Sequence, residues 1–269
     1  MEEYILICDG SPAGIFTAVY TAYEKKYPLS LTYIRTEEEE TLRLFASYLS
    51  VPTEEEKAVK VGRSLRRRLG ERVTRALWHV MASPHPDRGT AVLRTAARGL
   101  SGECKGYLLD NLQDPYIALA ASLDKTIRNE IHHYYGFLRF SELRGGILYA
   151  EIEPKGQLLE FLGEHFSDRF PEENFVIRDV GREEYLVHPA GKGWFLAGNI
   201  KGDFQVTSGR ESGEGSEEGD GLIYSHREEE IRKLFRGFVH AISIEARENK
   251  NLQRQLLPLR FRPYMVDFR

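Results

Sequence analysis

The first residues that could do chemistry are Asp9 and Ser11, which flank Gly10 between an apolar run and an expected helix. In α/β folds, such a segment binds phosphates through backbone N–H groups and the helix dipole, and a carboxylate there can also hold a metal ion. The segment lacks the glycine pattern of a nucleotide or phosphate loop. The alternative is a turn aspartate followed by a serine helix cap, which is common turn chemistry.

A second group of residues interleaves basic and flat side chains near the middle of the chain. Aromatic faces with cationic neighbours suit unstacked nucleobases. The alternative is core packing where a helix meets a strand, although a histidine or arginine needs a polar partner in a dry interior. The group comprises His132 and Arg139 with Tyr134, Tyr135, Phe137 and Phe140.

A third group of polar residues lies near the C-terminus. Asn and Gln side chains can read base edges, and Arg side chains can hold phosphates. The alternative is a chain end that wraps the domain and uses its amides to satisfy backbone groups. The group comprises Glu245, Arg247, Asn249, Gln253, Gln255, Arg260 and Arg262.

The net charge of −4 conceals a strong separation of charge along the chain. Residues 57–105 contain twelve Lys and Arg against three acids, and residues 232–269 contain nine against three. Acidic runs at 36–56 and 203–230 restore the balance. Because salt confines each patch's field to about 10 Å, a local basic surface can attract a polyanion on a chain that is acidic overall.

One helix is expected to carry most of the basic residues of the segment 57–105. An apolar stripe at helical spacing joins Leu65 to Val80, and the arginines lie largely off it. These side chains are predicted to contact a phosphate backbone; the alternative is a solvated helix face. The arginines are Arg63, Arg66, Arg67, Arg68, Arg72 and Arg75, of which Arg66, Arg67, Arg68 and Arg72 are the predicted nucleic-acid contacts.

Composition excludes several classes of protein and site. Two distant cysteines, Cys8 and Cys104, exclude a disulfide framework, a zinc knuckle and a self-contained iron–sulfur site. The eight histidines show no ligand spacing and no hydrolase motif occurs, so no metal and no cofactor are predicted. No apolar run is long enough for a membrane span, and the start MEEYILICDG has acids where an export signal has bases. We therefore expect a cytoplasmic protein with no membrane partner.

The order of expected elements predicts an α/β or α+β fold, with a mixed sheet, flanking helices and a helical basic insert. Strand, helix and strand at 4–8, 12–23 and 31–35 suggest a parallel pair. A long helix beginning at Asp114-Pro115 is expected to end at a Gly136 cap. One domain is predicted over 1–269, with possible lobes at 1–112 and 113–269 and a mobile acidic, glycine-rich loop at 201–222. Later strands are expected at 137–140, 146–152, 175–180, 185–188 and 194–197, with helices at 158–170 and from Ser225.

Four blocks of sequence resemble a bacterial family associated with DNA repair and DNA metabolism. The resemblance implies a core that is a domain of unknown function, encoded beside a radical S-adenosylmethionine protein that is suspected of DNA modification or repair. It also implies that some longer relatives fuse this domain to a uracil-DNA glycosylase-type domain. The blocks are ICDGSPAGIFTAVYTAYEKK at 7–26, EIHHYYGFLRFSEL at 130–143, and the segments 149–182 and 244–268.

Three positions depart from the family pattern. His133 stands where the family usually has Arg, Arg178 where His is expected, and Leu256 where His is common. These departures favour binding roles over catalytic roles at those positions. Positions that match the pattern include Glu130 and Asp179.

The resemblance and the charge pattern lead to one functional expectation and two alternatives. The expected function is an accessory DNA-binding component of a repair or modification system that works with the radical S-adenosylmethionine enzyme. The first alternative is an enzyme acting on DNA, a base-excising or phosphodiester hydrolase that uses Asp9 or Glu245. The second is a protein–protein scaffold. A shared cleft is also expected, lined by Asp9, His132, Arg139, Arg247 and Asn249.

Overall fold

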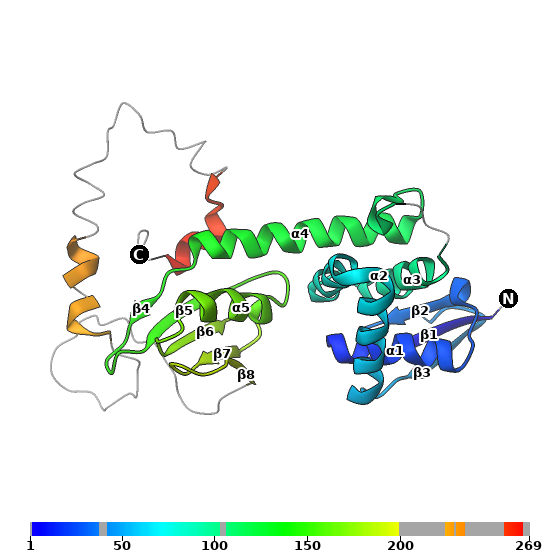
Figure 1. Ribbon diagram of the computed structural model, residues 1–269, viewed down its shortest axis with the longest axis horizontal. Coiled ribbons are helices and arrows are strands. Elements are labelled where there is room, and N and C mark those ends of the chain that lie inside the picture. The colour runs from blue at the N-terminus through cyan, green and yellow to red at the C-terminus, as the bar shows by residue number, and fades with distance from the viewer. Residues whose placement is uncertain are drawn as a thin grey trace. The chain divides into compact units, whose positions relative to one another are not determined.

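The computed structural model describes residues 2–37, 42–102, 106–198, 224–228, 230–234 and 256–265. It has a mixed α/β architecture with a parallel sheet, a mixed sheet and flanking helices (Figure 1), so the predicted fold class is confirmed. The chain divides into two compact units, and the boundary between them in the sequence falls within α4. Unit 1 comprises Met1–Glu130 and Lys155–Gln157, and unit 2 comprises Ile131–Pro154 and Leu158–Arg269.

Unit 1 is built on a three-stranded parallel sheet in the order β2-β1-β3. The predicted parallel pair is confirmed, and so is the helix start, since the Ser11 hydroxyl accepts the Gly14 N–H at 2.9 Å with Pro12 in the first turn. The third strand was not predicted, because its side chains are only half buried and give a weak pattern. The elements are β1 (Glu3–Ile7), α1 (Pro12–Glu24), β2 (Thr32–Arg35), β3 (Ala46–Ser50), α2 (Glu55–Ala82), α3 (Arg88–Leu100) and the first part of α4 (Pro115–Phe137).

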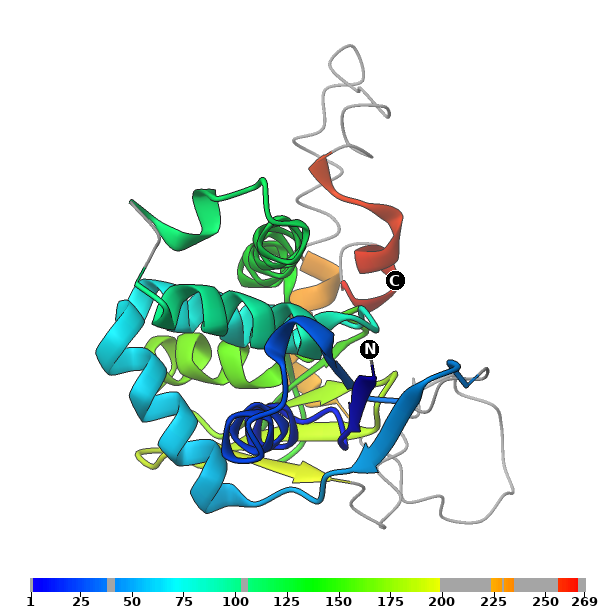
Figure 2. The same cartoon turned by 90° about the vertical axis from the view of Figure 1, so that its right-hand side faces the viewer.

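The predicted apolar stripe of α2 is buried except at Leu69, which is half buried. Leu65 and Leu77 are at most 1% exposed, and α2 packs across α1, which Figure 2 shows end-on, and against α3. Gly70 interrupts the helix with φ 83° and ψ 166°, a conformation that side-chain-bearing residues rarely adopt. The helix therefore changes direction at Gly70, in the middle of its basic sequence.

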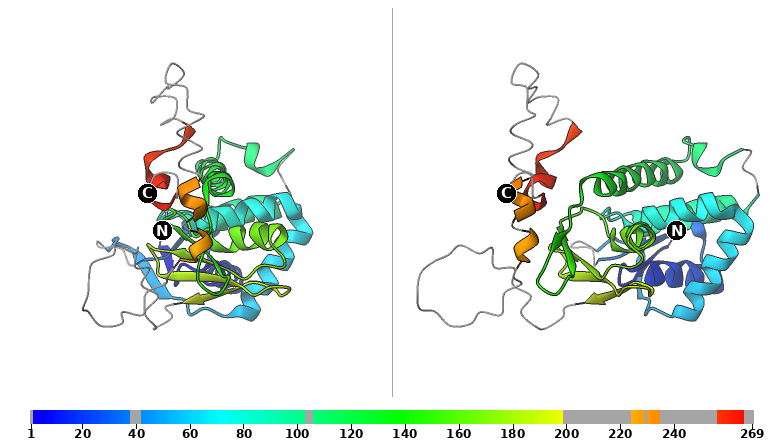
Figure 3. Two further views of the ribbon diagram at one scale, coloured as in Figure 1. Left: turned by 90° about the vertical axis from the view of Figure 1, so that its left-hand side faces the viewer. Right: turned by 60° about the vertical axis from the view of Figure 1, so that its left-hand side comes forward.

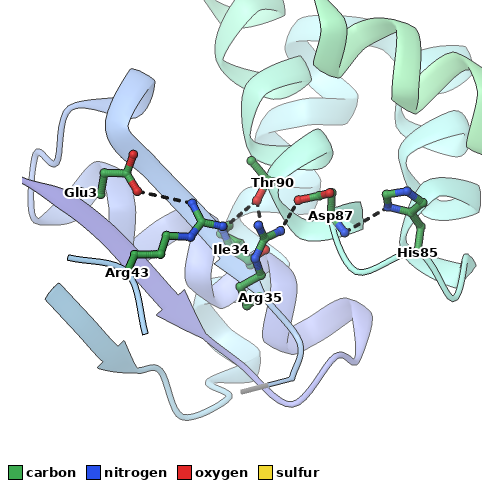
Figure 4. Close-up of polar contacts among 7 residues, drawn as sticks. All are labelled: Glu3, Ile34, Arg35, Arg43, His85, Asp87 and Thr90. Carbon is green, nitrogen blue, oxygen red and sulfur yellow. Dashed lines mark hydrogen bonds and ion pairs between the residues drawn. The ribbon is translucent and has the colours of Figure 1, made fainter. Parts of the chain in front are cut away.

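Helix α3 covers the open edge of β2. The Thr90 hydroxyl donates to the Ile34 carbonyl at 3.1 Å and accepts the Ile34 N–H at 3.0 Å (Figure 4). Arg35 at the end of β2 pairs with Asp87 just before α3. The Thr90 hydroxyl thus satisfies the Ile34 backbone groups that an unpaired edge strand would expose.

Unit 2 contains a five-stranded sheet in the order β4-β5-β6-β7-β8. β5 and β6 are parallel and are joined through α5, which lies against one face of the sheet (Figure 3), and the other pairs are antiparallel. The core between α5 and the sheet is aromatic: the Phe140 ring lies 5.3 Å from Phe166 and 5.5 Å from Phe175. The elements are β4 (Ser141–Glu142), β5 (Leu148–Ile152), α5 (Leu159–Arg169), β6 (Phe175–Asp179), β7 (Glu184–His188), β8 (Phe195–Gly198) and a 3-10 segment at Leu259–Tyr264.

Two predictions around residue 137 are wrong. α4 continues through Gly136 to Phe137, and Gly136 does not adopt the left-handed conformation of a glycine cap. The predicted strand at 137–140 does not form, and β4 begins only at Ser141. The reason is packing: the Phe137 ring lies 5.4 Å from Phe261, and Phe140 turns into the aromatic core of unit 2. The apolar residues at 137–140 therefore belong to a partly buried connection between α4 and β4, and not to a strand.

Two buried carboxylates hold loops in shape. Glu130, which is 4% exposed, accepts the Lys155 N–H at 3.0 Å and the Gly156 N–H at 3.1 Å. Asp179, which is 1% exposed, accepts the Gly181 N–H at 3.1 Å and an Arg182 Nη1 bond at 2.9 Å. Both residues match the family pattern, and these contacts give them structural roles.

Within the described part of the chain, no helix is both long and apolar enough to cross a membrane. The acidic loop predicted at 201–222 lies outside the described residues. The helix predicted from Ser225 is observed at 226–228 and 230–234, with the Ser225 hydroxyl accepting the Glu228 N–H at 3.0 Å.

Two threonines on α3 provide a test of the contact between α3 and β2. Thr90→Val should lower the free energy of unfolding by about 1–3 kcal/mol, because it leaves both backbone groups of Ile34 without their partner. Thr95 is equally buried, but its hydroxyl has no hydrogen-bond partner among the described residues. Thr95→Val should therefore leave stability unchanged or raise it. Urea denaturation measures both, and equal effects of the two substitutions would contradict the assignment.

Candidate functional site

The strongest concentration of cations in the described residues is on α2. We call it the α2 basic surface and define it as Lys60, Arg63, Arg66, Arg67, Arg68, Arg72 and Arg75, all of which are exposed. The surface arises because the apolar stripe of the helix is buried and the intervening positions face solvent. All four predicted contacts on α2, Arg66, Arg67, Arg68 and Arg72, thus lie where a ligand can reach them.

Arg66 and Arg72 of this surface contact neighbouring side chains. Arg66 Nε lies 2.8 Å from Glu71, the only acid between residues 57 and 75. The Arg72 guanidinium lies over the Tyr107 ring at 3.9 Å. An exposed ion pair contributes little to stability, so a phosphate can displace Glu71 from Arg66 at small cost.

Asp9 lies at the carboxyl end of β1, at the edge of the parallel sheet where Thr53 follows β3. Its carboxylate accepts the Ser11 N–H at 2.9 Å, the Ser11 hydroxyl at 2.7 Å and the Thr53 hydroxyl at 2.6 Å. Partial burial raises the pKa of Asp9, but the hydrogen bonds from Thr53 and Ser11 outweigh it and hold the pKa below its usual value. The turn-and-cap alternative therefore accounts for the observed contacts of Asp9.

A basic side chain fixes the turn after Asp9. Arg88 Nη2 donates to the Gly10 carbonyl at 3.2 Å, and Nη1 donates to the Ser83 carbonyl at 2.7 Å. Gly10 has φ 78°, a conformation that favours glycine, and a Cβ there would lie 2.8 Å from Arg88 Nη2 and displace that guanidinium. In the part of the chain that is described, no three His, Cys, Asp or Glu side chains form a metal-binding group.

Unit 2 contains a small polar pocket at the junction of β4 and β5. The predicted residue Arg139 lines it, and its Nη1 donates to the Gly136 carbonyl at 2.7 Å. Tyr149 donates to Glu151 at 3.2 Å, and burial followed by the charge of Glu151 raises the pKa of Tyr149. Arg178 lies 3.6 Å from Glu151. The lining residues are Arg139, Ser141, Tyr149, Ala150, Glu151, Tyr224 and Tyr264.

The pocket residues other than Arg139 were not among the predicted site residues. A signal was present, because Glu151 and Arg178 are register partners on adjacent strands and opposite charges there attract. The sequence did not reveal that β5 and β6 are neighbours, and Arg178 was noted only as a departure from the family pattern.

The described part of the C-terminal block packs onto the end of α4. Phe261 is 2% exposed, and its ring lies 5.0 Å from Tyr134 and 5.6 Å from His133. Arg260 is exposed, with its guanidinium 4.6 Å from the Phe261 ring. Core packing and wrapping therefore account for these aromatic residues.

The remaining predicted residues divide into two groups. His132 is exposed on α4. Glu245, Arg247, Asn249 and Gln253 lie outside the described residues. The expected shared cleft, which needs Arg247 and Asn249, therefore stays a prediction.

Comparisons with known proteins identify a family but no activity. A family model described as a domain of unknown function, DUF4130, matches residues 86–267. No curated protein matches the chain. A solved structure described as the DHH domain of a member of a family of ribosomal proteins is similar at 11% identity and a TM-score of 0.31, over 70% of this chain and 74% of that one.

Thr53 allows the electrostatics of Asp9 to be tested. Thr53→Val removes the hydroxyl that donates to the carboxylate at 2.6 Å, so the pKa of Asp9 should rise toward its usual value. A carbon-13 NMR titration of the Asp9 carboxyl measures this. Thr126→Val, on the exposed side of α4, is the control and should leave that titration unchanged. An unaltered titration in Thr53→Val would remove the proposed cause.

Proposed function

Since the chain belongs to the DUF4130 family, whose description names no activity, we propose a function from the charge and geometry of its own residues. The proposal is an accessory DNA-binding component of a cytoplasmic DNA repair or modification system. The α2 basic surface holds the phosphate backbone, and the partner in the reaction is a radical S-adenosylmethionine enzyme.

The α2 basic surface is the observation that carries the proposal. Its seven exposed cations face solvent with a single acid, Glu71, among them. Like charges on neighbouring helix turns repel, so the surface is unfavourable to the isolated chain and favourable to a bound polyanion. Contacts of this kind recognise the backbone and carry no sequence preference.

The choice of DNA and of the partner enzyme is supported by the sequence resemblance. With two cysteines in all, the chain cannot supply the thiolates of an iron–sulfur cluster, so the radical chemistry belongs to the partner. The accessory role is to bind DNA and present it to that enzyme. Co-purification of the two proteins, followed by activity assays of the pair on DNA, tests this part.

The enzyme alternative gains no specific support from Asp9. Its carboxylate is engaged by three hydrogen bonds, and its lowered pKa makes it unsuitable as a general acid at neutral pH and weaker as a general base. Turnover by the protein alone on lesion-bearing oligonucleotides would decide for the enzyme alternative.

The proposed function predicts a loss of DNA binding when the four arginines named from the sequence are removed. Changing Arg66, Arg67, Arg68 and Arg72 together to Ala should weaken DNA binding on all sequences and reduce its salt slope by about 0.9 for each lost phosphate contact. Fluorescence anisotropy over a range of salt concentrations measures both. An unchanged affinity and slope would leave α2 as a solvated face.

A control variant separates the local surface from net charge. Changing Lys125, Arg144, Lys192 and Lys233 to Ala removes the same number of positive charges from exposed positions that do not belong to α2. This variant should keep most of the affinity and most of the salt slope. Equal losses in the two variants would mean that total charge alone determines binding.

Removing the acid of the α2 basic surface should instead strengthen DNA binding. Glu71→Gln removes the acid that holds Arg66 at 2.8 Å, so DNA should bind about two- to five-fold more tightly. Glu172→Gln, at an exposed acid of unit 2, is the matched control for loss of one negative charge. Weaker binding by Glu71→Gln would show that Glu71 orients Arg66 rather than occupying it.

A further inference from the structure

A short apolar groove lies between α1 and α2, beside the α2 basic surface. We call it the α1–α2 groove; all of its lining residues belong to unit 1. Its floor is made of buried aliphatic side chains, Val19, Val61 and Leu65. The complete lining is Val19, Tyr20, Tyr23, Lys60, Val61, Ser64, Leu65 and Leu100.

Two tyrosines contribute flat side chains to the lining. Tyr23 is 41% exposed, and partial burial raises the pKa of its hydroxyl. Tyr20 is half buried, and the Lys57 ammonium lies 5.5 Å from its ring. The groove thus offers aromatic surface above an aliphatic floor, which suits a flat apolar face.

The length of the groove limits what can occupy it. Its residues on α1 run from Val19 to Tyr23, about 6 Å at 1.5 Å per residue, and those on α2 run from Lys60 to Leu65, about 7.5 Å. An amphipathic helix that anchors residues i to i+7 needs about 10.5 Å. The groove is therefore too short for a docked helix and has room for one flat group.

The charge at its edge identifies the partner chemistry. Lys60 lines the groove and belongs to the α2 basic surface, and Arg63 and Arg67 follow it at helical spacing along α2. Lys57 is paired with Glu24 and Glu54 and adds little to this charge. A cationic edge beside an aromatic recess is the arrangement that binds single-stranded nucleic acid, with phosphates on the cations and a base on the ring.

We propose that the α1–α2 groove holds one unstacked nucleobase of the DNA strand whose phosphates contact the α2 basic surface. This inference rests on the proposed function and deepens it, because it makes unpaired DNA the preferred substrate. Stacking on Tyr23 and contact with the aliphatic floor accept any base, so the groove selects for an unpaired nucleotide and not for a sequence.

The test compares three DNA probes with the full-length protein. They are a single strand, a perfect duplex, and the same duplex with one unpaired 2-aminopurine, a base analogue whose fluorescence reports stacking. Tyr23→Ala should weaken binding to the single strand and the unpaired-base duplex by about 5- to 100-fold and leave the perfect duplex unchanged. Tyr23→Phe, which keeps the ring, should behave like the native protein.

Two further variants show whether a loss of binding comes from the groove itself and not from unfolding or from the loss of any exposed aromatic residue. Ser64→Leu fills the groove from an exposed helix position with a better helix former, so it should reproduce the loss without unfolding α2. Phe195→Ala is the control, because Phe195 is an aromatic residue that is 50% exposed and lies in unit 2. It should change none of the three affinities.

The outcomes distinguish this inference from the proposed function. If the quadruple arginine variant retains all DNA binding, the proposed function fails. If that variant loses binding while Tyr23→Ala and Ser64→Leu affect duplex and unpaired DNA alike, or affect neither, only the groove inference is overturned. Binding of an acidic amphipathic peptide that Tyr23→Ala abolishes, with every DNA affinity unchanged, would also overturn it.

Discussion

The amphipathic pattern of α2 is the constraint on which unit 1 and its charged surface depend. Leu65 and Leu77 are removed from water, and each such aliphatic side chain contributes about 1.5–3 kcal/mol when it is fully buried. This burial fixes the rotation of α2 about its own axis on each side of the interruption at Gly70, so the intervening arginines face solvent. Arg63 and Arg67 are then like charges on neighbouring turns, an arrangement that weakens an isolated helix. A bound polyanion reverses the sign of that cost, which is why the basic surface is more readily understood as a binding surface than as a solubilising one.

Acidic residues in the resemblance blocks follow a different logic. Asp9, Glu130 and Asp179 each accept backbone N–H groups and so hold a loop in one conformation. A carboxylate that is engaged in this way stabilises the position of a chain segment and has little remaining capacity for proton transfer. The matches to the family pattern at these three positions are therefore explained by the structural roles of the carboxylates. They give no indication of a reaction.

The sequence predicted the elements whose periodicity is set by burial, and failed where tertiary contacts override a local pattern. The first strand and helix, the apolar stripe of α2 and the exposure of its arginines all follow from residue spacing. β3 escaped notice because its side chains are only half buried, and α4 passes through Gly136 because Phe137 packs against Phe261. The pocket around Tyr149 and Glu151 depends on the pairing of β5 with β6, and the α1–α2 groove depends on how two helices pack. The pairing of β5 with β6 and the packing of α1 on α2 cannot be predicted from the spacing of residues along a single element.

The family match divides the chain into a first part that carries the α2 basic surface and a second part that carries the polar pocket of unit 2. The match covers residues 86–267, whereas α2 ends at Ala82, so the basic surface lies wholly before it. The polar pocket of unit 2, with Arg139, Tyr149 and Glu151, lies within it. The resemblance block at 7–26 also precedes the match, so the likeness to the family is not confined to the matched region. In the proposed function, phosphate binding by α2 would bring DNA to the protein, which would leave the matched region available for contact with the partner enzyme.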